Sequence, residues 1–307
     1  MARALGQTNT EGGSEPASLI ANARMYSVSA KAGGVWRELL SAIVAQAGVR
    51  VAVIDHPPPA PLEDLWLRTD QAAVFMCGLP YSRAIPQPVL IAAPVPSPAE
   101  FHGAPHYWSD FVVRKDSDFR KVQDTFGRRI AFTVPGSQSG CAAALSYLMA
   151  AHRELAADAE ALTPLRAPLF SEIIAPTITP MGALAAVVDG AAEIAPIDCY
   201  ALRLLRKYRP DLASAVRVVG QTVPIPIPPL VASATSVSEK ERGALQSAFL
   251  EAHQSASLKP LMDELLLLGF ARPDSNAYAV LRERFDAATA YWSSRRLAAH
   301  THPAFVL

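Results

Sequence analysis

Two serine hydroxyls and a glycine stand together in the run Ser137-Gln138-Ser139-Gly140, which is suited to binding an anion. Residues 130–134 are β-branched and aromatic and predict a buried strand, whereas the alanine-rich residues 141–150 predict a helix. The run therefore lies where a strand ends and a helix begins. Backbone N–H groups at a helix N-terminus lack intrahelical partners and carry partial positive charge, so hydroxyls there complete an anion cradle. The alternative is that Ser137 or Ser139 only caps the helix.

Several other turns occupy the same place between a predicted strand and a predicted helix. They are Gly33-Gly34, Cys77-Gly78-Leu79-Pro80-Tyr81, Thr179-Pro180-Met181-Gly182 and Asp198-Cys199-Tyr200. Ligands of α/β sheets bind at the carboxyl ends of strands and the N-termini of the following helices, so we expect one cleft to collect these turns. Aromatic residues with polar tips also line such clefts. Besides the serine-glycine turn, the expected lining residues are Gly34, Cys77, Tyr81, Tyr107, Thr179 and Asp198.

The cysteines and histidines predict neither a metal site nor a cofactor. Cys77, Cys141 and Cys199 are far apart and form no CxxC pair, which argues against zinc and against a disulfide framework. His102 and His106 have helical spacing, but the glycine and proline between them break any helix. Cys141 lies in the first turn of its helix, where a thiol can become nucleophilic, yet no partner residue is placed to activate it. A small buried residue is the simpler interpretation.

Charge and hydropathy exclude two classes of partner. Acidic and basic residues balance at 28 each among 307 residues, so no global field favours nucleic acid or an anionic membrane. The apolar run 261–270 is interrupted by two acidic residues and predicts a buried helix rather than a membrane span. Residues 1–23 are polar and contain no apolar core of an export signal, so we expect a disordered tail and a cytoplasmic location.

The elements that must position the turns alternate between strands and helices. Expected strands cover residues 24–30, 49–54, 72–76, 89–93, 130–134, 169–174, 192–197, 216–222 and 230–234. Helices are expected near residues 35–48, 141–150, 180–188 and 200–208, and again over 238–253, 258–268 and 278–292. This alternation predicts an α/β fold with mostly parallel sheets. A chain of this length suggests about two domains.

Several of these local patterns occur together in one known family. The stretch 107–117, then 127–131 and Ser137-Gln138-Ser139-Gly140, resembles the signature of the phosphate/phosphite/phosphonate-binding proteins of ABC transporters. Residues 190–198, which end in Asp198, resemble that family's second strand-entry motif, and residues 77–81 are similar to a turn in one of its branches. The likeness extends from about Arg24 to Ala234, most of the chain.

The resemblance implies a type 2 periplasmic-binding-protein fold, with two lobes of mixed, mostly parallel sheets around a central ligand cleft. It places residues 24–108 and 220–307 in the first lobe and 109–219 in the second, with the crossings near residues 107–108 and 220–222. It also implies that Ser137, Gln138 and Ser139 hold the oxygens of a phosphonate. Asp198 would receive an amino group where the ligand carries one.

The turn Thr179-Pro180-Met181-Gly182 departs from the family pattern. Many relatives have a Ser-His or Gly-His step there, in which the histidine contacts the anion, whereas proline and methionine supply no such contact. Thr179 still offers one hydroxyl. The departure points toward an anion other than a phosphonate.

Three functions are consistent with these features. The first is a solute-binding protein that captures a small oxyanion or phosphonate-like ligand by lobe closure, for uptake with an ABC transporter permease as partner. In this family such proteins are typically periplasmic, which the expected lack of an export signal does not match. The second is a cytoplasmic enzyme of thiamine-pyrimidine metabolism on the same fold, and the third is a cytoplasmic ligand sensor. No histidine accompanies the predicted site, which argues against the enzyme.

Overall fold

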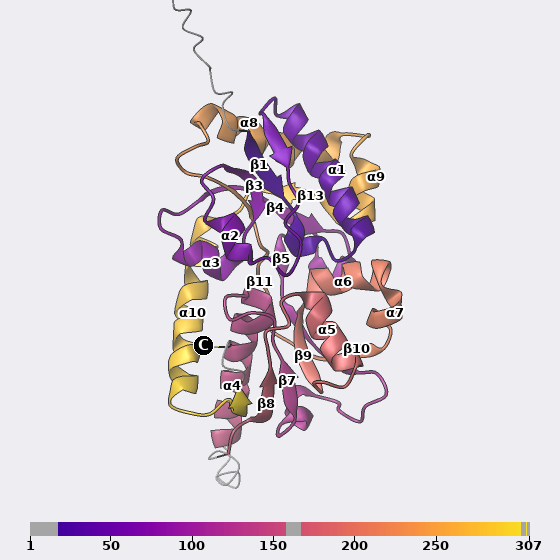
Figure 1. Ribbon diagram of the computed structural model, residues 1–307, viewed down its shortest axis with the longest axis vertical. Coiled ribbons are helices and arrows are strands. Elements are labelled where there is room, and N and C mark those ends of the chain that lie inside the picture. Colours follow the sequence, from indigo (N-terminus) through magenta and orange to yellow (C-terminus); the bar gives the residue numbers. More distant parts are fainter. Residues whose placement is uncertain (1–17, 158–166, 302–304, 306–307) are drawn as a thin grey trace, which may run out of the picture.

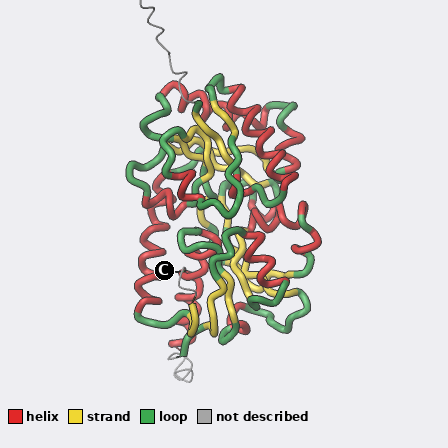
Figure 2. Tube along the Cα trace, viewed as in Figure 1, coloured by secondary structure: helices red, strands yellow, loops and turns green. Residues whose placement is uncertain are grey.

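Two α/β bodies lie one above the other along the long axis of the protein, as the computed structural model in Figure 1 shows. The structure describes residues 18–157, 167–301 and 305. Each body contains a six-stranded sheet, and a two-stranded ladder lies between the bodies. Figure 2 shows the strands in the interior of each body with helices outside them. The predicted two-lobed α/β fold around mixed sheets is confirmed.

The first sheet has the strand order β13-β4-β12-β3-β1-β2. Its strands are β1 (Leu19–Asn22), β2 (Val51–Val53), β3 (Gln71–Phe75), β4 (Val89–Pro96), β12 (Leu230–Ala232) and β13 (Leu267–Ala271). Its helices are α1 (Ala30–Gln46), α2 (Leu62–Trp66), α3 (Gly78–Arg83), α8 (Glu239–Glu251) and α9 (Lys259–Glu264). Parallel pairing is limited to β3, β1 and β2, whereas β12, β4 and β13 pair in antiparallel fashion.

The second sheet has the order β10-β6-β9-β7-β8-β14. Its strands are β6 (Ser109–Arg114), β7 (Arg129–Ala131), β8 (Phe170–Ile174), β9 (Ile194–Asp198), β10 (Val216–Gln221) and β14 (Ala298–Thr301). The helices of this body are α4 (Ala143–Ala157), α5 (Pro180–Val188), α6 (Cys199–Tyr208) and α7 (Pro210–Ala213). The one-turn helices, 3₁₀ in type, are η1 (Arg24–Tyr26), η2 (Ala99–Phe101), η3 (Val122–Thr125) and η7 (Ala252–Gln254). Strands β9, β7, β8 and β14 are parallel, β6 pairs with β9 in antiparallel fashion, and β10 pairs with β6 in antiparallel fashion.

Both ends of the chain differ from expectation. The predicted disordered tail of residues 1–23 is wrong for its last residues, because Leu19–Asn22 form the fully buried β1, inserted between β2 and β3; residues 1–17 lie outside the described residues. The predicted helix over residues 258–268 stops at Glu264, and Leu267–Ala271 form β13. Residues 298–301, which the family resemblance places in the first lobe, form β14 and pair with β8 of the second sheet.

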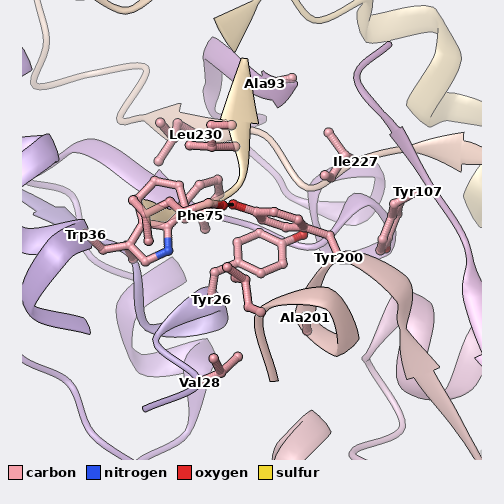
Figure 3. Packing of buried hydrophobic residues seen from close by; sticks show 14 of the residues in the cluster. Tyr26, Val28, Trp36, Phe75, Ala93, Tyr107, Tyr200, Ala201, Ile227 and Leu230 are labelled. Carbon is pink, nitrogen blue, oxygen red and sulfur yellow. Dashed lines mark hydrogen bonds between the residues drawn. The ribbon is translucent and has the colours of Figure 1, made fainter. Parts of the chain in front are cut away.

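The two bodies share a continuous aromatic core beside the crossing strands. The ladder of β5 (His106–Tyr107) and β11 (Ile225–Pro226) connects the bodies. Figure 3 shows Tyr200, in the first turn of α6 of the second body, facing Tyr26 of the first body, and Phe75 and Trp36 pack on Tyr26. The Tyr26 and Tyr200 ring centroids are 4.7 Å apart, and the Tyr200 hydroxyl donates to the carbonyl oxygen of Leu265 at 2.6 Å. Burial of apolar side chains therefore stabilises the contact between the two bodies as well as the core of each body.

Helix α10 (Ser275–Ser293) runs along both bodies on one side of the molecule (Figure 1). At its first turn, the Tyr278 hydroxyl donates to the carbonyl oxygen of Ile227 at 2.8 Å. Near its end, the Trp292 indole N–H donates to the carbonyl oxygen of Leu145 in α4 at 3.1 Å. The helix packs on α3 of the first body and on α4 of the second.

A buried carboxylate on β6 is surrounded by donors beside the crossing strands. Asp110 is fully buried, and its Oδ1 accepts from the Trp108 indole N–H at 2.9 Å and from the Gln221 amide at 2.8 Å. Its Oδ2 forms an ion pair with Arg203 of α6. The same guanidinium also binds Glu100 of η2 at 2.9 Å, so it connects the two bodies.

We expect Arg203→Met to lower the free energy of unfolding by about 3–5 kcal/mol, because it leaves Asp110 charged and buried without its cation. Arg114→Met is the matched control: Arg114 pairs with Asp116 on the surface, and its loss should cost less than about 1 kcal/mol. Urea unfolding of both variants measures the difference. Adding Asp110→Asn to Arg203→Met should recover part of the loss, and a double variant as unstable as the sum of its parts would contradict this account.

Candidate functional site

A cleft of about 250 Å³ lies between the two bodies and collects residues from both. The first body contributes Arg24, Glu63 and Cys77, and the second contributes Thr133, Ser137, Ser139 and Asp198. Prolines and apolar residues complete the walls: Met25, Pro59, Pro61, Trp66, Val134, Pro176, Ile178 and Pro180. Four of the residues predicted to line the cleft are found in its wall: Cys77, Ser137, Ser139 and Asp198.

Parallel pairing of β7 with β9 brings the polar residues of the second body together. Ile130 of β7 lies opposite Ile194 of β9. Because the two strands run in the same direction, the chain leaves both at one edge of the sheet. Thr133 follows β7 and Asp198 ends β9, so both reach the cleft at that edge.

The serine-glycine turn begins α4 with one π-helical turn, η4 (Gln138–Ala142). Such turns are rare and are frequently found at functional sites. The Ser137 Oγ accepts from the Gly140 backbone N–H at 3.0 Å, so Ser137 caps the helix while its own proton stays free to donate. The Ser139 hydroxyl donates a long hydrogen bond of 3.5 Å to Asp198 Oδ2. The Ser109 hydroxyl donates to the Ser139 carbonyl oxygen at 2.7 Å.

Gly140 leaves the space that the Thr133 side chain fills. A Cβ on Gly140 would lie 2.0 Å from Thr133 Oγ1 and 2.9 Å from Ser137 Oγ. The Thr133 hydroxyl is itself buried and has no hydrogen-bond partner among the residues that the structure describes. Sequence reasoning missed Thr133 because it lies inside the strand predicted over residues 130–134, whereas β7 ends at Ala131. A buried hydroxyl without a partner at the wall of a cleft is placed to bind a ligand.

Asp198 is a buried carboxyl on the wall of the cleft. Its Oδ1 accepts from the Ala201 backbone N–H at 2.9 Å and so caps α6, and its Oδ2 lies 3.4 Å from the Tyr26 hydroxyl. Burial raises the pKa of Asp198 to about 7, and these hydrogen bonds oppose the rise only in part. Near neutral pH this carboxyl can therefore accept or donate a proton.

Cys77 lies two residues beyond β3, as the N-cap residue of α3, and lines the wall of the cleft. Burial raises the pKa of its thiol to about 12, although the backbone N–H of Gln138 opposes the shift. A protonated, buried thiol is a poor nucleophile. Burial also raises the pKa values of the other two thiols, Cys141 and Cys199, so the geometry favours packing over chemistry at all three cysteines.

Arg24 is the basic side chain among the described residues that line the cleft. Its guanidinium donates to the carbonyl oxygen of Ala60, and burial lowers its pKa while Glu63 acts in the opposite direction. Sequence reasoning missed Arg24 because the first strand was expected over residues 24–30. With β1 at Leu19–Asn22, Arg24 lies two residues beyond the end of a strand. The other predicted site residues were chosen for the same kind of position.

Two expected site residues lie on other surfaces. Gly34 does not begin its helix, because α1 starts at Ala30 with Ser29 as its N-cap; Gly34 lines a separate hollow on the first body. Gln138 is turned to the opposite side of its turn from Ser137 and Ser139 and lines a hollow between α4 and α10. The side on which its side chain emerges depends on the π-helical turn, which the sequence does not reveal.

Four further expected residues are near the cleft without being part of its wall. Thr179 uses its hydroxyl to cap α5 through the Gly182 backbone N–H at 3.0 Å. Tyr81 is buried against the Tyr278 ring, and Gly140 lies beneath Thr133. Tyr107 is fully buried, and its hydroxyl has no partner of hydrogen-bonding geometry within the described ranges. Burial raises the pKa of the Tyr107 hydroxyl most. The nearby Cys77 and Asp198 raise this pKa further, whereas a contact with Ser139 lowers it.

Comparisons with known proteins identify the family. The sequence profile of the family described as "ABC transporter, phosphonate, periplasmic substrate-binding protein" matches residues 36–278. The chain belongs to this family. Its members bind a solute for an ABC transporter, so this protein has a solute-binding role, and the resemblance seen in the sequence is confirmed. Among curated protein sequences, none matches the chain.

Solved structures of related proteins share the fold. A binding-protein component of an ABC phosphonate transporter from Pseudomonas aeruginosa has a TM-score of 0.70 and 17% identity, with 91% of this chain and 89% of that chain covered. PhnD1 from Prochlorococcus marinus, in complex with methylphosphonate, has a TM-score of 0.67 and 18% identity over 88% of this chain and 97% of its own. A Xanthomonas citri protein bound to ATP has a TM-score of 0.54 and 15% identity over 90% and 98%. At these identities the likeness shows the fold alone.

The family bears on location and on the rival functions. It is a family of periplasmic proteins, so the expectation of a cytoplasmic location has no support. The enzyme and the cytoplasmic sensor are not favoured for the same reason. Across the described ranges no helix is long and apolar enough to cross a membrane.

Gly140→Ala should damage the site, because the new methyl group would lie 2.0 Å from Thr133 Oγ1. We expect a loss of stability of about 1–3 kcal/mol, typical of overpacking, measured by thermal unfolding. Gly34→Ala is the control: nothing lies within 4 Å of its Cβ, and alanine in a helix should stabilise by up to about 1 kcal/mol. Equal effects of the two substitutions would contradict the packing described for Gly140.

Asp198→Asn should change how stability depends on pH. Between the ordinary pKa of 3.8 and the raised value of about 7, the folded wild type keeps a proton that the unfolded chain has lost. Its free energy of unfolding therefore falls as pH rises through this window. Asparagine can still cap α6 but carries no charge, so the stability of Asp198→Asn relative to wild type should rise by about 2–4 kcal/mol between pH 4 and pH 7. A constant difference in urea unfolding across this range would contradict the raised pKa.

Proposed function

We propose that this protein captures a small oxyanion or phosphonate-like ligand in the cleft between its two bodies. The ligand's oxygens would bind Ser139, Ser137 and Thr133 and the first N–H groups of the helix that begins at η4. The bodies act as lobes that close by bending near β5 and β11. A permease of an ABC transporter is the proposed partner, and the role is binding without catalysis.

The observation that carries this proposal is the excess of hydroxyl donors at one point of the cleft. Ser137, Ser139 and Thr133 surround the N-terminus of a long helix, and Thr133 has no partner within the described part of the chain. Tyr107 adds a second unpartnered hydroxyl close by. An anion that loses its hydration on closure would be stabilised by these fixed dipoles.

Charge in the cleft favours a ligand of low charge. Arg24 supplies one positive charge, and Glu63 partly offsets it. Asp198 would repel a dianion when ionised, but with a pKa near 7 it can instead donate its proton to a ligand oxygen. A monoanion, or a phosphonate that retains one proton, fits this arrangement better than a dianion. The lack of histidine in the turn Thr179–Gly182 agrees with that preference.

Binding should be lost when the hydroxyls are removed. We expect one or more of phosphate, phosphite, methylphosphonate, 2-aminoethylphosphonate, sulfate and small carboxylates to raise the melting temperature of the wild type. A ligand at 100 times its Kd adds about 2.7 kcal/mol. Ser139→Ala removes a hydrogen bond to a charged group and should weaken binding by about 10- to 100-fold.

Ser293→Ala is the matched control for this experiment. Ser293 lies exposed on α10, where its hydroxyl donates to the Thr289 carbonyl oxygen, and its loss should leave binding unchanged. Two results would overturn the proposal. One is that no anion of the panel stabilises the wild type, and the other is that Ser139→Ala responds to the ligand as Ser293→Ala does.

A further inference from the structure

A second hollow lies outside the cleft, between α4, α10 and the chain segment 222–225 that crosses between the bodies. We call it the hinge hollow. Its volume is about 340 Å³, within the range of small-molecule sites, which is roughly 300–1,000 Å³. Its walls are largely apolar and come from all three elements: Ala143 and Met149, Val223 and Ile225, and Leu281 and Phe285.

Polar groups of the hinge hollow are few, and two of them already have partners. The Thr222 hydroxyl accepts from the Ser109 backbone N–H at 2.9 Å, and the Ser146 hydroxyl donates to the Ala142 carbonyl oxygen at 3.3 Å. Gln138 differs from both. It is only 4% exposed, and its Oε1 is buried with no partner among the described residues. A buried acceptor without a partner has lost its hydrogen bonds to water, and a ligand that donates to it would restore one.

One cation lies at the rim of the hinge hollow. Arg284 of α10 lines it and is exposed, and its guanidinium forms no ion pair or hydrogen bond with any residue in the described ranges. The neighbouring arginines of α10 and α3 differ, because Arg282 and Arg83 both pair with Asp286. Val223, on the crossing segment, is 65% exposed at the same hollow. An apolar floor with a free cation at its rim selects an amphipathic anion.

We propose that the hinge hollow is a second ligand site, and that it binds an amphipathic organic carboxylate. The apolar body of the ligand fills the space between α4 and α10, and its carboxylate pairs with Arg284. A hydroxyl on the ligand body can donate to Gln138 Oε1. The site is separate from the cleft, because Ser137 and Ser139 line the cleft whereas Gln138 between them lines the hollow. It does not depend on the function proposed for the cleft.

A ligand in the hinge hollow contacts parts that lobe motion would displace relative to one another. The segment 222–225 belongs to the crossing, α4 to the second body, and α10 is packed on both bodies. Filling the space between them therefore favours the lobe angle at which the three elements fit the ligand best. The proposed site is thus placed to act on closure from outside the cleft.

Octanoate is the test ligand, with 1-octanol as its uncharged counterpart, and calorimetric titration of the full chain is the measurement. We expect octanoate to bind the wild type, and Arg284→Gln to weaken octanoate by about tenfold while leaving octanol unchanged. Ala287→Trp, which places a large ring in the hollow, should abolish binding of both. Ala150→Trp, on the facing helix α4, is the second filling variant for use if Ala287→Trp fails to fold.

Ala290→Trp and Ser139→Ala are the controls, and both should keep wild-type affinity for octanoate. Ala290 is exposed on α10 but does not line the hinge hollow, and Ser139 belongs to the cleft. Three results would overturn the proposal: no binding of octanoate by the wild type, undiminished binding by the filling variants, or equal binding by Arg284→Gln and wild type. Loss of octanoate binding in Ser139→Ala would place octanoate in the cleft and would likewise disprove the second site.

Discussion

The parallel pairing of β7 with β9 is the constraint on which the cleft depends. At the start of the pair, Arg129 donates its backbone N–H to Glu193 at 2.8 Å and pairs with the same carboxylate at 2.7 Å, which fixes the register. With the strands in register and parallel, Thr133 and Asp198 emerge at one edge. A shift by one residue would turn the alternating side chains to the opposite faces, so the cleft needs this register as well as these residues.

Burial at the junction of the two bodies explains the unusual chemistry of Asp198. Its carboxyl belongs to the second body, but Tyr26 from the first body reaches it, and Tyr200 of α6 packs on the Tyr26 ring. This aromatic contact excludes water from the base of the cleft. The same packing that joins the bodies therefore contributes to the burial that raises the pKa of Asp198.

The sequence predicted the elements around the serine-glycine turn well, because strand and helix periodicities there are long and separated by clear turns. The prediction failed where an element was short, and where the role of a residue depended on the direction in which its side chain points. Leu19–Asn22 form a strand of only four residues beside a polar tail, and the leucines near Leu267–Ala271 fit helix and strand equally. The glycine pair predicted that a helix starts at Gly34, but the helix starts at Ala30 and Ser29 caps it. The direction of the Gln138 side chain depends on a π-helical turn, and no sequence pattern predicts such a turn.

The placement of β13 and β14 has a consequence for synthesis on the ribosome. The chain supplies the edge strand of the first sheet at Leu267–Ala271 and that of the second at Ala298–Thr301, and α10 between them covers both bodies. The first sheet therefore lacks a strand until Leu267–Ala271 have been translated, and the second until Ala298–Thr301 have been translated. The nascent protein therefore exposes open sheet edges late into elongation, when neighbouring chains can pair with them. The first sheet receives its last strand before the second, because Leu267–Ala271 precede Ala298–Thr301 in the chain.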